Sequence, residues 1–216
     1  MADVARDMGV AQGTLYGWVE SKDALFWLVI DRWGGDEPFD GVLPVVAPTK
    51  PEILARVRER MVGITALPRL AQTLGADPTA DVRGKLAGIL EELWDVLSHT
   101  ALAADMVERS ARDWPDLSAL FYTTVRGGLL TRLADFLDRG VRSGRFLPMA
   151  DSRVGAQLLL ETITWFARHR FRDPESSGLS DPQARQTVIP LLVNAVVGGQ
   201  WKAGRKSLIR SRTGAP

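Results

Sequence analysis

Apolar residues recur at helical spacing along most of the chain, with polar residues between them. Such a pattern is typical of amphipathic helices that bury one face. It predicts helices over residues 51 to about 67, 80 to 99, 100 to 112 and 115 to about 144. No stretch shows the strict apolar and polar alternation of a half-buried strand. The sequence therefore predicts an all-α fold.

Two further helices are predicted near the C-terminal end, over residues 151–171 and 181–201. Asp151 and Asp181 stand where N-caps belong, and Pro182 follows at the first helical position. Both helices are apolar around more of their circumference than one surface helix buries in its own core. We therefore expect them to bury apolar surface against another molecule as well.

Three short helices are predicted at the N-terminal end, over residues 1–8, 12–19 and 22–33. Gly9 separates the first two, because glycine adopts the left-handed conformation that ends a helix without a Cβ penalty. Ser21 precedes an acidic first turn and an apolar run, which indicates an N-cap. The N-terminal segment is thus predicted to consist of short helices with tight turns.

The region 36–50 is rich in residues that favour loops, and it marks the best domain boundary. The sequence is therefore divided into a head over residues 1–35, a helical body over residues 36–204 and a basic tail over residues 205–216. The residues on which the boundary depends are Pro38, Gly41, Pro44 and Pro48.

Hydrophobic residues make up 45% and charged residues 25% of the chain, which is ordinary for a globular protein. No apolar run is long enough to span a bilayer and no secretory signal is evident, so we expect a cytoplasmic protein without membrane contact. The chain has no cysteine. It also lacks a phosphate-binding loop, a nucleophile elbow and metal-ligand spacing. An enzyme is therefore disfavoured, and no cofactor or metal is expected.

Residues 8–26 read MGVAQGTLYGWVESKDALF. This stretch resembles the DNA-binding motif of the TetR family of one-component bacterial transcriptional repressors, with the pattern G-V-x-x-G-T-L-Y-x-x-[FV]-x-S-K-x-x-L. The resemblance extends more loosely over the rest of the chain. It implies a helix-turn-helix DNA-binding head on a helical body that binds an effector and dimerises. The matching residues are Gly9, Val10, Gly13, Thr14, Leu15, Tyr16, Val19, Ser21, Lys22 and Leu25.

The resemblance implies that the second helix lies in the major groove of a double-stranded DNA operator. Some of its side chains would contact phosphates and fix the register, while others would read base edges. Gln12 can pair with adenine, and Thr14 can meet a thymine methyl group. Alternatively, Tyr16 and Trp18 only pack within the head. The residues expected to contact DNA are Gln12, Gly13, Thr14, Tyr16, Gly17, Trp18 and Lys22.

Several features depart from the family pattern. Ala11 replaces a small hydroxyl residue, which removes an N-cap oxygen and a phosphate contact. Glu20 stands where a basic residue is common, and residues 1–35 carry a net charge of −2. Family members also have a helix upstream of the motif, which is expected to be missing from this chain. Together these features allow weak DNA affinity or an unusual operator.

The resemblance also implies a small-molecule effector bound between body helices, whose binding releases the dimer from DNA. Few charged residues interrupt the helix faces concerned, so a bulky apolar or amphipathic effector is favoured. The alternative for each residue is that it belongs to the ordinary core. The candidates for the effector site are Leu86, Ile89, Leu93, Trp94, Met106, Phe121, Tyr122 and Val125.

In the family, the last two helices form a four-helix bundle with their copies in a homodimer. A metal or acid–base pair between His169 and Glu161 is disfavoured, because eight residues separate them along one helix. The acidic pairs Asp105 with Glu108 and Glu91 with Glu92 are expected to be solvated helix faces. The dimer-interface candidates are Leu158, Glu161, Thr162, Trp165, His169, Leu192 and Val196.

The leading hypothesis is a homodimeric, ligand-responsive transcriptional repressor. The first alternative is a dimeric small-molecule-binding protein of the same fold with impaired DNA binding. A basic helix encoded in frame upstream of Met1 would weigh against this alternative. The second alternative, an enzyme on an all-α scaffold, lacks any supporting motif.

Overall fold

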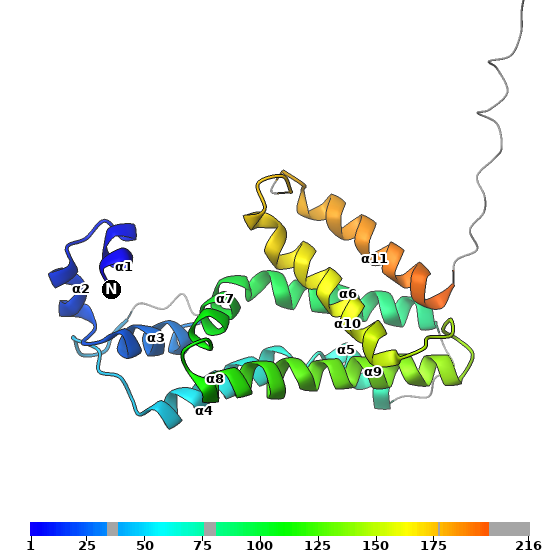
Figure 1. Cartoon of the computed structure of the whole chain (residues 1–216), viewed down its shortest axis with the longest axis horizontal. Helices are drawn as coiled ribbons and strands as arrows, with labels where there is room; N and C mark the ends of the chain where they lie inside the picture. The colour runs from blue at the N-terminus through cyan, green and yellow to red at the C-terminus, as the bar shows by residue number, and fades with distance from the viewer. Residues whose placement is uncertain (34–38, 76–80, 177, 199–216) are drawn as a thin grey trace, which may run out of the picture.

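The computed structural model describes residues 1–33, 39–75, 81–176 and 178–198. Three short helices, α1 (Ala2–Asp7), α2 (Gln12–Trp18) and α3 (Lys22–Asp31), lie at one end of an elongated helical body (Figure 1). A single isolated β-bridge is the only extended pairing in these ranges. The predicted all-α class is confirmed for the part of the chain described.

Local signals position the three N-terminal helices. Gly9 has a φ of +68° and reverses the chain between α1 and α2, as predicted. Ser21 caps α3, because its Oγ accepts a hydrogen bond from the Ala24 amide at 3.0 Å. Ala11 precedes α2 without any side-chain cap. These helices enclose a small core of Ala5, Leu15, Val19 and Ala24, which Val45 completes.

Val45 comes from the segment that follows α3 and returns to the N-terminal helices. Its amide donates to the carbonyl of Trp18 at 2.8 Å, and its carbonyl accepts from the Glu20 amide at 3.0 Å. The side chain is buried in the N-terminal core. The predicted boundary between residues 35 and 36 would assign Val45 to the body, but it packs with the N-terminal helices.

The next helices are α4 (Lys50–Ile64), α5 (Pro68–Gly75), α6 (Val82–His99) and α7 (Ala101–Ser110). Glu52 caps the start of α4 by accepting a hydrogen bond from the Thr49 amide at 2.8 Å. The sequence predicted one helix to about residue 67 and missed α5. Leu67 has a φ of +44°, and Pro68 opens the new helix because its fixed φ suits a first helical position.

The long helix predicted from Pro115 contains a change of winding. It begins as α8 (Pro115–Ser118), continues as a π-helical segment, η1 (Ala119–Arg126), and ends as α9 (Gly127–Arg142). Gly144, with a φ of +69°, terminates it. The turn that follows returns Phe146 to the core, where its ring meets Phe136 edge to face.

The helix predicted over 151–171 also changes winding. It consists of α10 (Ser152–Thr164), a π-helical segment, η2 (Trp165–His169), and a 3-10 turn, η3 (Arg170–Arg172). Asp151 caps it as predicted, since its Oδ1 accepts from the Arg153 amide at 2.7 Å. The predicted cap of α11 (Asp181–Val197) was wrong: the Ser180 side chain accepts from the Gln183 amide. Asp181 is the first helical residue instead.

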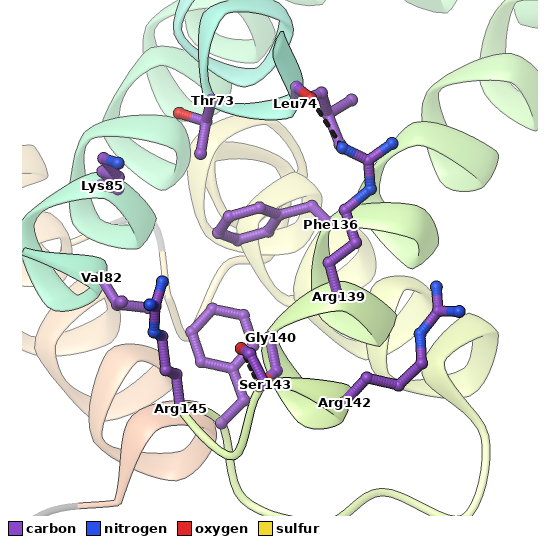
Figure 2. Close-up of a pocket in the computed structure, with 11 residues that line it drawn as sticks. Thr73, Leu74, Val82, Lys85, Phe136, Arg139, Gly140, Arg142, Ser143 and Arg145 are labelled. Atoms are coloured by element: carbon purple, nitrogen blue, oxygen red, sulfur yellow. Dashed lines mark hydrogen bonds between the residues drawn. The ribbon is translucent and has the colours of Figure 1, made fainter. Parts of the chain in front are cut away.

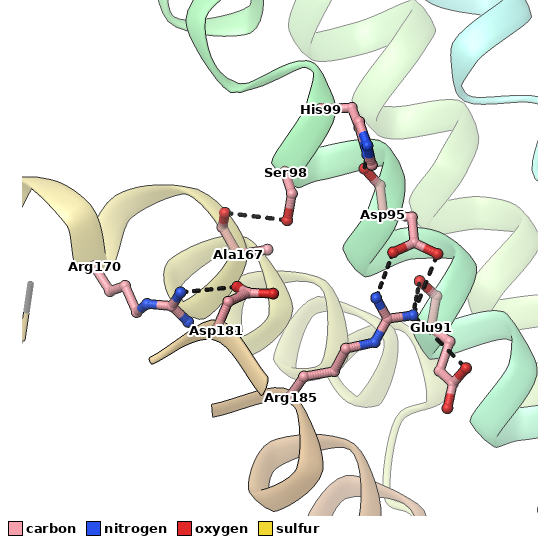
Figure 3. A network of polar contacts seen from close by, with 8 residues as sticks. All are labelled: Glu91, Asp95, Ser98, His99, Ala167, Arg170, Asp181 and Arg185. Atoms are coloured by element: carbon pink, nitrogen blue, oxygen red, sulfur yellow. Dashed lines mark hydrogen bonds and ion pairs between the residues drawn. The ribbon is translucent and has the colours of Figure 1, made fainter. Parts of the chain in front are cut away.

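Ion pairs hold α11 to its neighbours (Figure 3). Arg185 pairs with Asp95 of α6. Arg170 of η3 is fully buried, and its Nη2 donates to Asp181 Oδ1 at 2.8 Å. Asp181 thus binds Arg170 from the first helical position, while Ser180 occupies the N-cap position and caps the helix.

The largest core lies between α5, α6, α9, α10 and α11. A second core joins the end of α3 to α4, α7, α8 and η1, with Ile30, Ile53 and Val57 fully buried. None of the helices in the described ranges has the length and apolar character needed to cross a membrane. The basic tail predicted at 205–216 and the predicted extension of the last helix to 201 lie outside the described residues.

Candidate functional site

The residues predicted to contact DNA share one surface at the N-terminal end. Leu15 of α2 faces the core, and so does Val19, the residue directly after α2. The ring of Tyr16 is 44% exposed and that of Trp18 is 37% exposed, so neither is confined to the interior. All of the predicted contact residues are exposed: Gln12, Gly13, Thr14, Tyr16, Gly17, Trp18 and Lys22.

Gly13 and Gly17 are separated by one helical turn and leave the backbone of α2 uncovered. A Cβ atom built on either residue would meet nothing within 4 Å. Packing inside the protein therefore does not require glycine here. Each glycine costs a helix about 0.5 to 1 kcal/mol relative to alanine. Two such positions in a helix of 7 residues are suited to a surface that a partner approaches closely.

The exposed face of α2 carries hydrogen-bonding groups but no charge. Gln12 and Thr14 offer donors and acceptors, Tyr16 and Trp18 add an O–H and an N–H, and Lys22 supplies a cation from the start of α3. Arg6 pairs with Asp3 at 3.0 Å on α1, which offsets its charge. Glu20 is exposed beside this surface. The arrangement can bind a polar partner by hydrogen bonds, with little electrostatic attraction.

The effector candidates do not form one site. Leu86, Ile89, Leu93 and Trp94 are buried in the largest core. Phe121 and Val125 belong to the second core, with Met106 packed against it. Tyr122 is 44% exposed, and its ring meets that of Phe121 edge to face. Only Phe121 and Val125 line a cavity in this part of the body.

That cavity has a volume of about 120 Å³. Its apolar side is formed by Trp33, Met61, Val96, Leu97, Ala104, Phe121, Val125, Leu129 and Leu160. Its polar side is formed by Thr65, Thr100, Glu108, Arg126, Glu161, Thr164, Arg168 and His169. The sequence predicted two of these residues, Phe121 and Val125, as effector contacts. The others were missed because the wall comes from helices far apart in the chain.

Ion pairs lie along the polar side of this cavity, and the pair between Asp105 and Arg168 is buried. Asp105 and Arg168 are each only 6% exposed. Arg168 Nε donates to Asp105 Oδ1 at 2.7 Å, and Arg168 Nη2 pairs with Glu108 at 2.5 Å. Arg172 also pairs with Asp105. The prediction that Asp105 and Glu108 form a solvated face was wrong for Asp105, because arginines from η2 and η3 cover it.

A second pair, Arg126 with Glu161, lies on the same wall. Glu161 and His169, which the sequence placed at a dimer interface, therefore line a cavity within one chain. His169 forms no hydrogen bond with any described residue. Its pKa is lowered from 6.5, first by burial and then by the charge of Arg168. The imidazole is thus held neutral, with one donor and one acceptor available at the cavity.

Both π-helical segments of the described chain meet at this cavity. Phe121, Val125 and Arg126 come from η1, and Arg168 and His169 come from η2. π-helical turns are rare and are often found at functional sites. They displace side chains from the positions that a regular helix would give. Helical periodicity alone therefore could not have predicted the positions of Arg168 and His169 on this wall.

An apolar surface runs along α10 and α11. Leu158 of α10 is 61% exposed. Val154 of the same helix, Trp165 of η2 and Leu191 of α11 are exposed as well. Between the two helices lies an apolar groove of about 380 Å³ that includes Thr162, Phe166, Leu191 and Leu192. Of the interface candidates, Leu158, Thr162, Trp165 and Leu192 are thus accessible to a partner. Val196 is buried in the core of its own chain.

No group of three or more metal-binding side chains occurs among the residues that the structure describes. No protein-family model, curated protein or solved structure matches this chain. The proposals below therefore depend on the motif over residues 8–26 and on the structure.

Proposed function

We propose that the chain is a cytoplasmic, homodimeric, ligand-responsive transcriptional regulator of the TetR family that represses transcription by binding a double-stranded DNA operator. The observation that carries the proposal is the surface of α2. The family motif supplies its residues, and Gly13, Thr14, Tyr16 and Lys22 of that motif are exposed while Leu15 and Val19 are buried.

DNA binding would place α2 in the major groove, in the manner of helix-turn-helix proteins. Gly13 and Gly17 allow the helix backbone to approach the bases closely. Gln12 would read a base edge, and Thr14, Tyr16 and Lys22 would bind phosphates, which fix the register. With one lysine on the surface, the affinity should depend on salt less steeply than that of strongly basic DNA-binding proteins.

Effector binding would act through α4, which contacts α3 and also lines the 120 Å³ cavity. Arg56 of α4 pairs with Asp31 of α3 at 2.9 Å, and Arg60 Nη2 donates to the Asp31 carbonyl at 2.6 Å. Met61 and Thr65, from the same helix and its end, line the 120 Å³ cavity. A ligand that displaces α4 at the cavity would move α3 and the α2 surface with it.

The effector that this cavity favours is small, uncharged and amphipathic. Arg126, Arg168 and Arg172 are balanced by Glu161, Glu108 and Asp105, so a charged ligand would meet no unpaired counter-charge. An engineered apolar cavity of about 150 Å³ holds benzene, which indicates the size of a single ring. The apolar surface of α10 and α11 would form the homodimer.

The proposal is tested by selecting duplexes from a random DNA pool and titrating them by fluorescence anisotropy at two salt concentrations. Sequence-specific binding is expected. Lys22→Ala should weaken it and reduce the slope of log K against log salt by about 1. Arg58→Ala, an exposed arginine on α4, is the matched control and should change neither. Equal effects of both variants, or no selected sequence, would contradict DNA readout by α2.

One observation favours the alternative of a dimeric ligand-binding protein that does not bind DNA. Ala11 leaves α2 without a side-chain cap, and Glu20 is exposed beside the surface. Ala11→Ser and Glu20→Lys separate the alternatives. If the wild type does not bind DNA and the double variant does, the chain is a ligand-binding protein with an impaired head.

A further inference from the structure

A larger cavity lies at the end of the body opposite α1, α2 and α3. It has a volume of about 370 Å³ and is bordered by α5, α6, α9 and the turn after α9 (Figure 2). This is within the usual size range of sites for organic ligands. It shares no lining residue with the 120 Å³ cavity assigned to the effector, so it is a separate place for a ligand.

The charges around this cavity are of one sign. Its described lining includes Lys85, Arg139, Arg142 and Arg145 and contains no aspartate or glutamate. Arg139 Nη1 donates to the carbonyl of Leu74 at 2.6 Å, which fixes the guanidinium without neutralising it. Arg142 pairs with Asp138 and points away from the other lining residues (Figure 2). Arg139 and Arg145 have no carboxylate partner among the described residues, and their positive charges favour an anion.

Arg145 supplies an unused hydrogen-bond donor at the same place. Its side chain extends alongside Val82 (Figure 2), and its Nη1 is buried without a hydrogen-bond partner. An unpaired buried donor is unfavourable, and a hydrogen bond between charged groups is stronger than a neutral one. A carboxylate would complete this group, because its geometry matches the two-pronged guanidinium.

The floor of the cavity is aromatic. The rings of Phe136 and Phe146 lie 5.3 Å apart, edge to face. Gly140 makes this possible, since a Cβ there would be 2.0 Å from Phe146 Cδ2. Phe136 points into the space between the helices (Figure 2). Planar apolar molecules pack well on such rings.

We propose that this cavity binds an organic carboxylate with a planar apolar body, whose carboxylate accepts hydrogen bonds from Arg145 and whose rings pack on Phe136 and Phe146. This second ligand site is independent of the proposed regulatory function. Its occupancy requires neither DNA binding nor an effector in the 120 Å³ cavity.

The test uses isothermal titration calorimetry of the full chain with 2-naphthoate and with 2-naphthamide, which has nearly the same shape but no charge. We expect 2-naphthoate to bind at least about tenfold more tightly, as a charge-assisted hydrogen bond requires. Arg145→Met should reduce its affinity to that of the amide. Arg153→Met, an exposed arginine of α10, is the matched control and should have no effect.

A second variant, Thr73→Phe, fills the cavity from α5 without changing any charge. It should abolish binding of both compounds, and it keeps the test decisive if Arg145→Met fails to fold by circular dichroism. Equal affinity for carboxylate and amide, absence of 2-naphthoate binding, or binding unaffected by Thr73→Phe would each overturn the proposal.

Discussion

The core of the N-terminal helices is built from Ala5, Leu15, Val19, Ala24 and Val45, whereas the main core of the body extends across α5, α6, α9, α10 and α11. The small core leaves most side chains of α2 on the surface, where the proposed contacts with DNA would form. The large core encloses cavities and buried ion pairs. A substitution on the α2 surface is therefore expected to disturb few packing contacts, whereas a substitution in the body core is expected to disturb many.

The largest effect is expected from a substitution in the body core. Leu93→Ala removes a fully packed side chain of α6 that is 1% exposed. Such changes cost about 3 to 5 kcal/mol through lost burial and the cavity left behind. Denaturant unfolding followed by circular dichroism measures this loss. Leu102→Ala, exposed on α7, should change stability by less than about 0.5 kcal/mol.

The buried ion pair should give the next largest effect. Asp105→Asn leaves Arg168 with only Glu108 as a partner, and we expect a loss of about 3 kcal/mol, because breaking a buried pair strands a charge. Glu91→Gln is the control, since its pair with Arg185 is exposed. Asp105→Leu combined with Arg168→Met should recover stability. If the double variant is no more stable than Asp105→Asn, the stranded charge is not the cause.

The small core should respond to loss of its closing residue. Val45→Ala is expected to destabilise the N-terminal helices by about 1 to 2 kcal/mol, in proportion to the buried methyl groups removed. Hydrogen–deuterium exchange should then accelerate in α1 and α2 but not in α6. Val46→Ala is the matched control, because Val46 is exposed. Equal acceleration in α6 would show that the two cores are not independent.

The surface glycines separate stability from recognition. Gly13→Ala and Gly17→Ala meet no atom within 4 Å, so each should stabilise α2 by about 0.5 to 1 kcal/mol. Each should also weaken DNA binding, because the added methyl group keeps the backbone away from the bases. Gly63→Ala on α4 is equally unobstructed and should stabilise without changing DNA affinity. Tighter DNA binding by the α2 variants would contradict the proposed contact.

The smallest effect concerns pH. Burial lowers the pKa of His169 in the folded chain below 6.5. As the pH falls, His169 therefore takes up its proton at a higher pH in the unfolded chain than in the folded chain. Its contribution to stability is therefore complete above pH 6.5 and is lost as the pH falls through the folded pKa. His169→Gln should reduce this part of the acid sensitivity of unfolding. An unchanged pH profile would show that other groups are responsible.

The sequence correctly predicted turns and helix caps that depend only on neighbouring residues. Gly9, Ser21 and Asp151 act as turn and cap residues because backbone geometry and nearby amides alone decide such roles. The predicted cap at Asp181 was wrong, because α11 begins at this residue and its side chain pairs with Arg170. It also missed α5, because the left-handed Leu67 before Pro68 has no local signature.

The surface of α2 was predictable for the same reason, since one short helix supplies most of its residues. Of the residues that line the 120 Å³ cavity, only Phe121 and Val125 were predicted, because the others come from helices that tertiary packing brings together. The burial of Asp105 depends on arginines more than 60 residues away in the sequence. Such partners are set by tertiary packing and leave no local pattern.

The most direct test of the central claim is hydrogen–deuterium exchange of the full chain with and without a selected DNA duplex. Binding by the α2 surface predicts slower exchange in residues 12–22, at salt concentrations where the duplex is bound, and little direct protection of α10 and α11. Slower exchange confined to the body, or no change in residues 12–22 with DNA bound, would contradict the account.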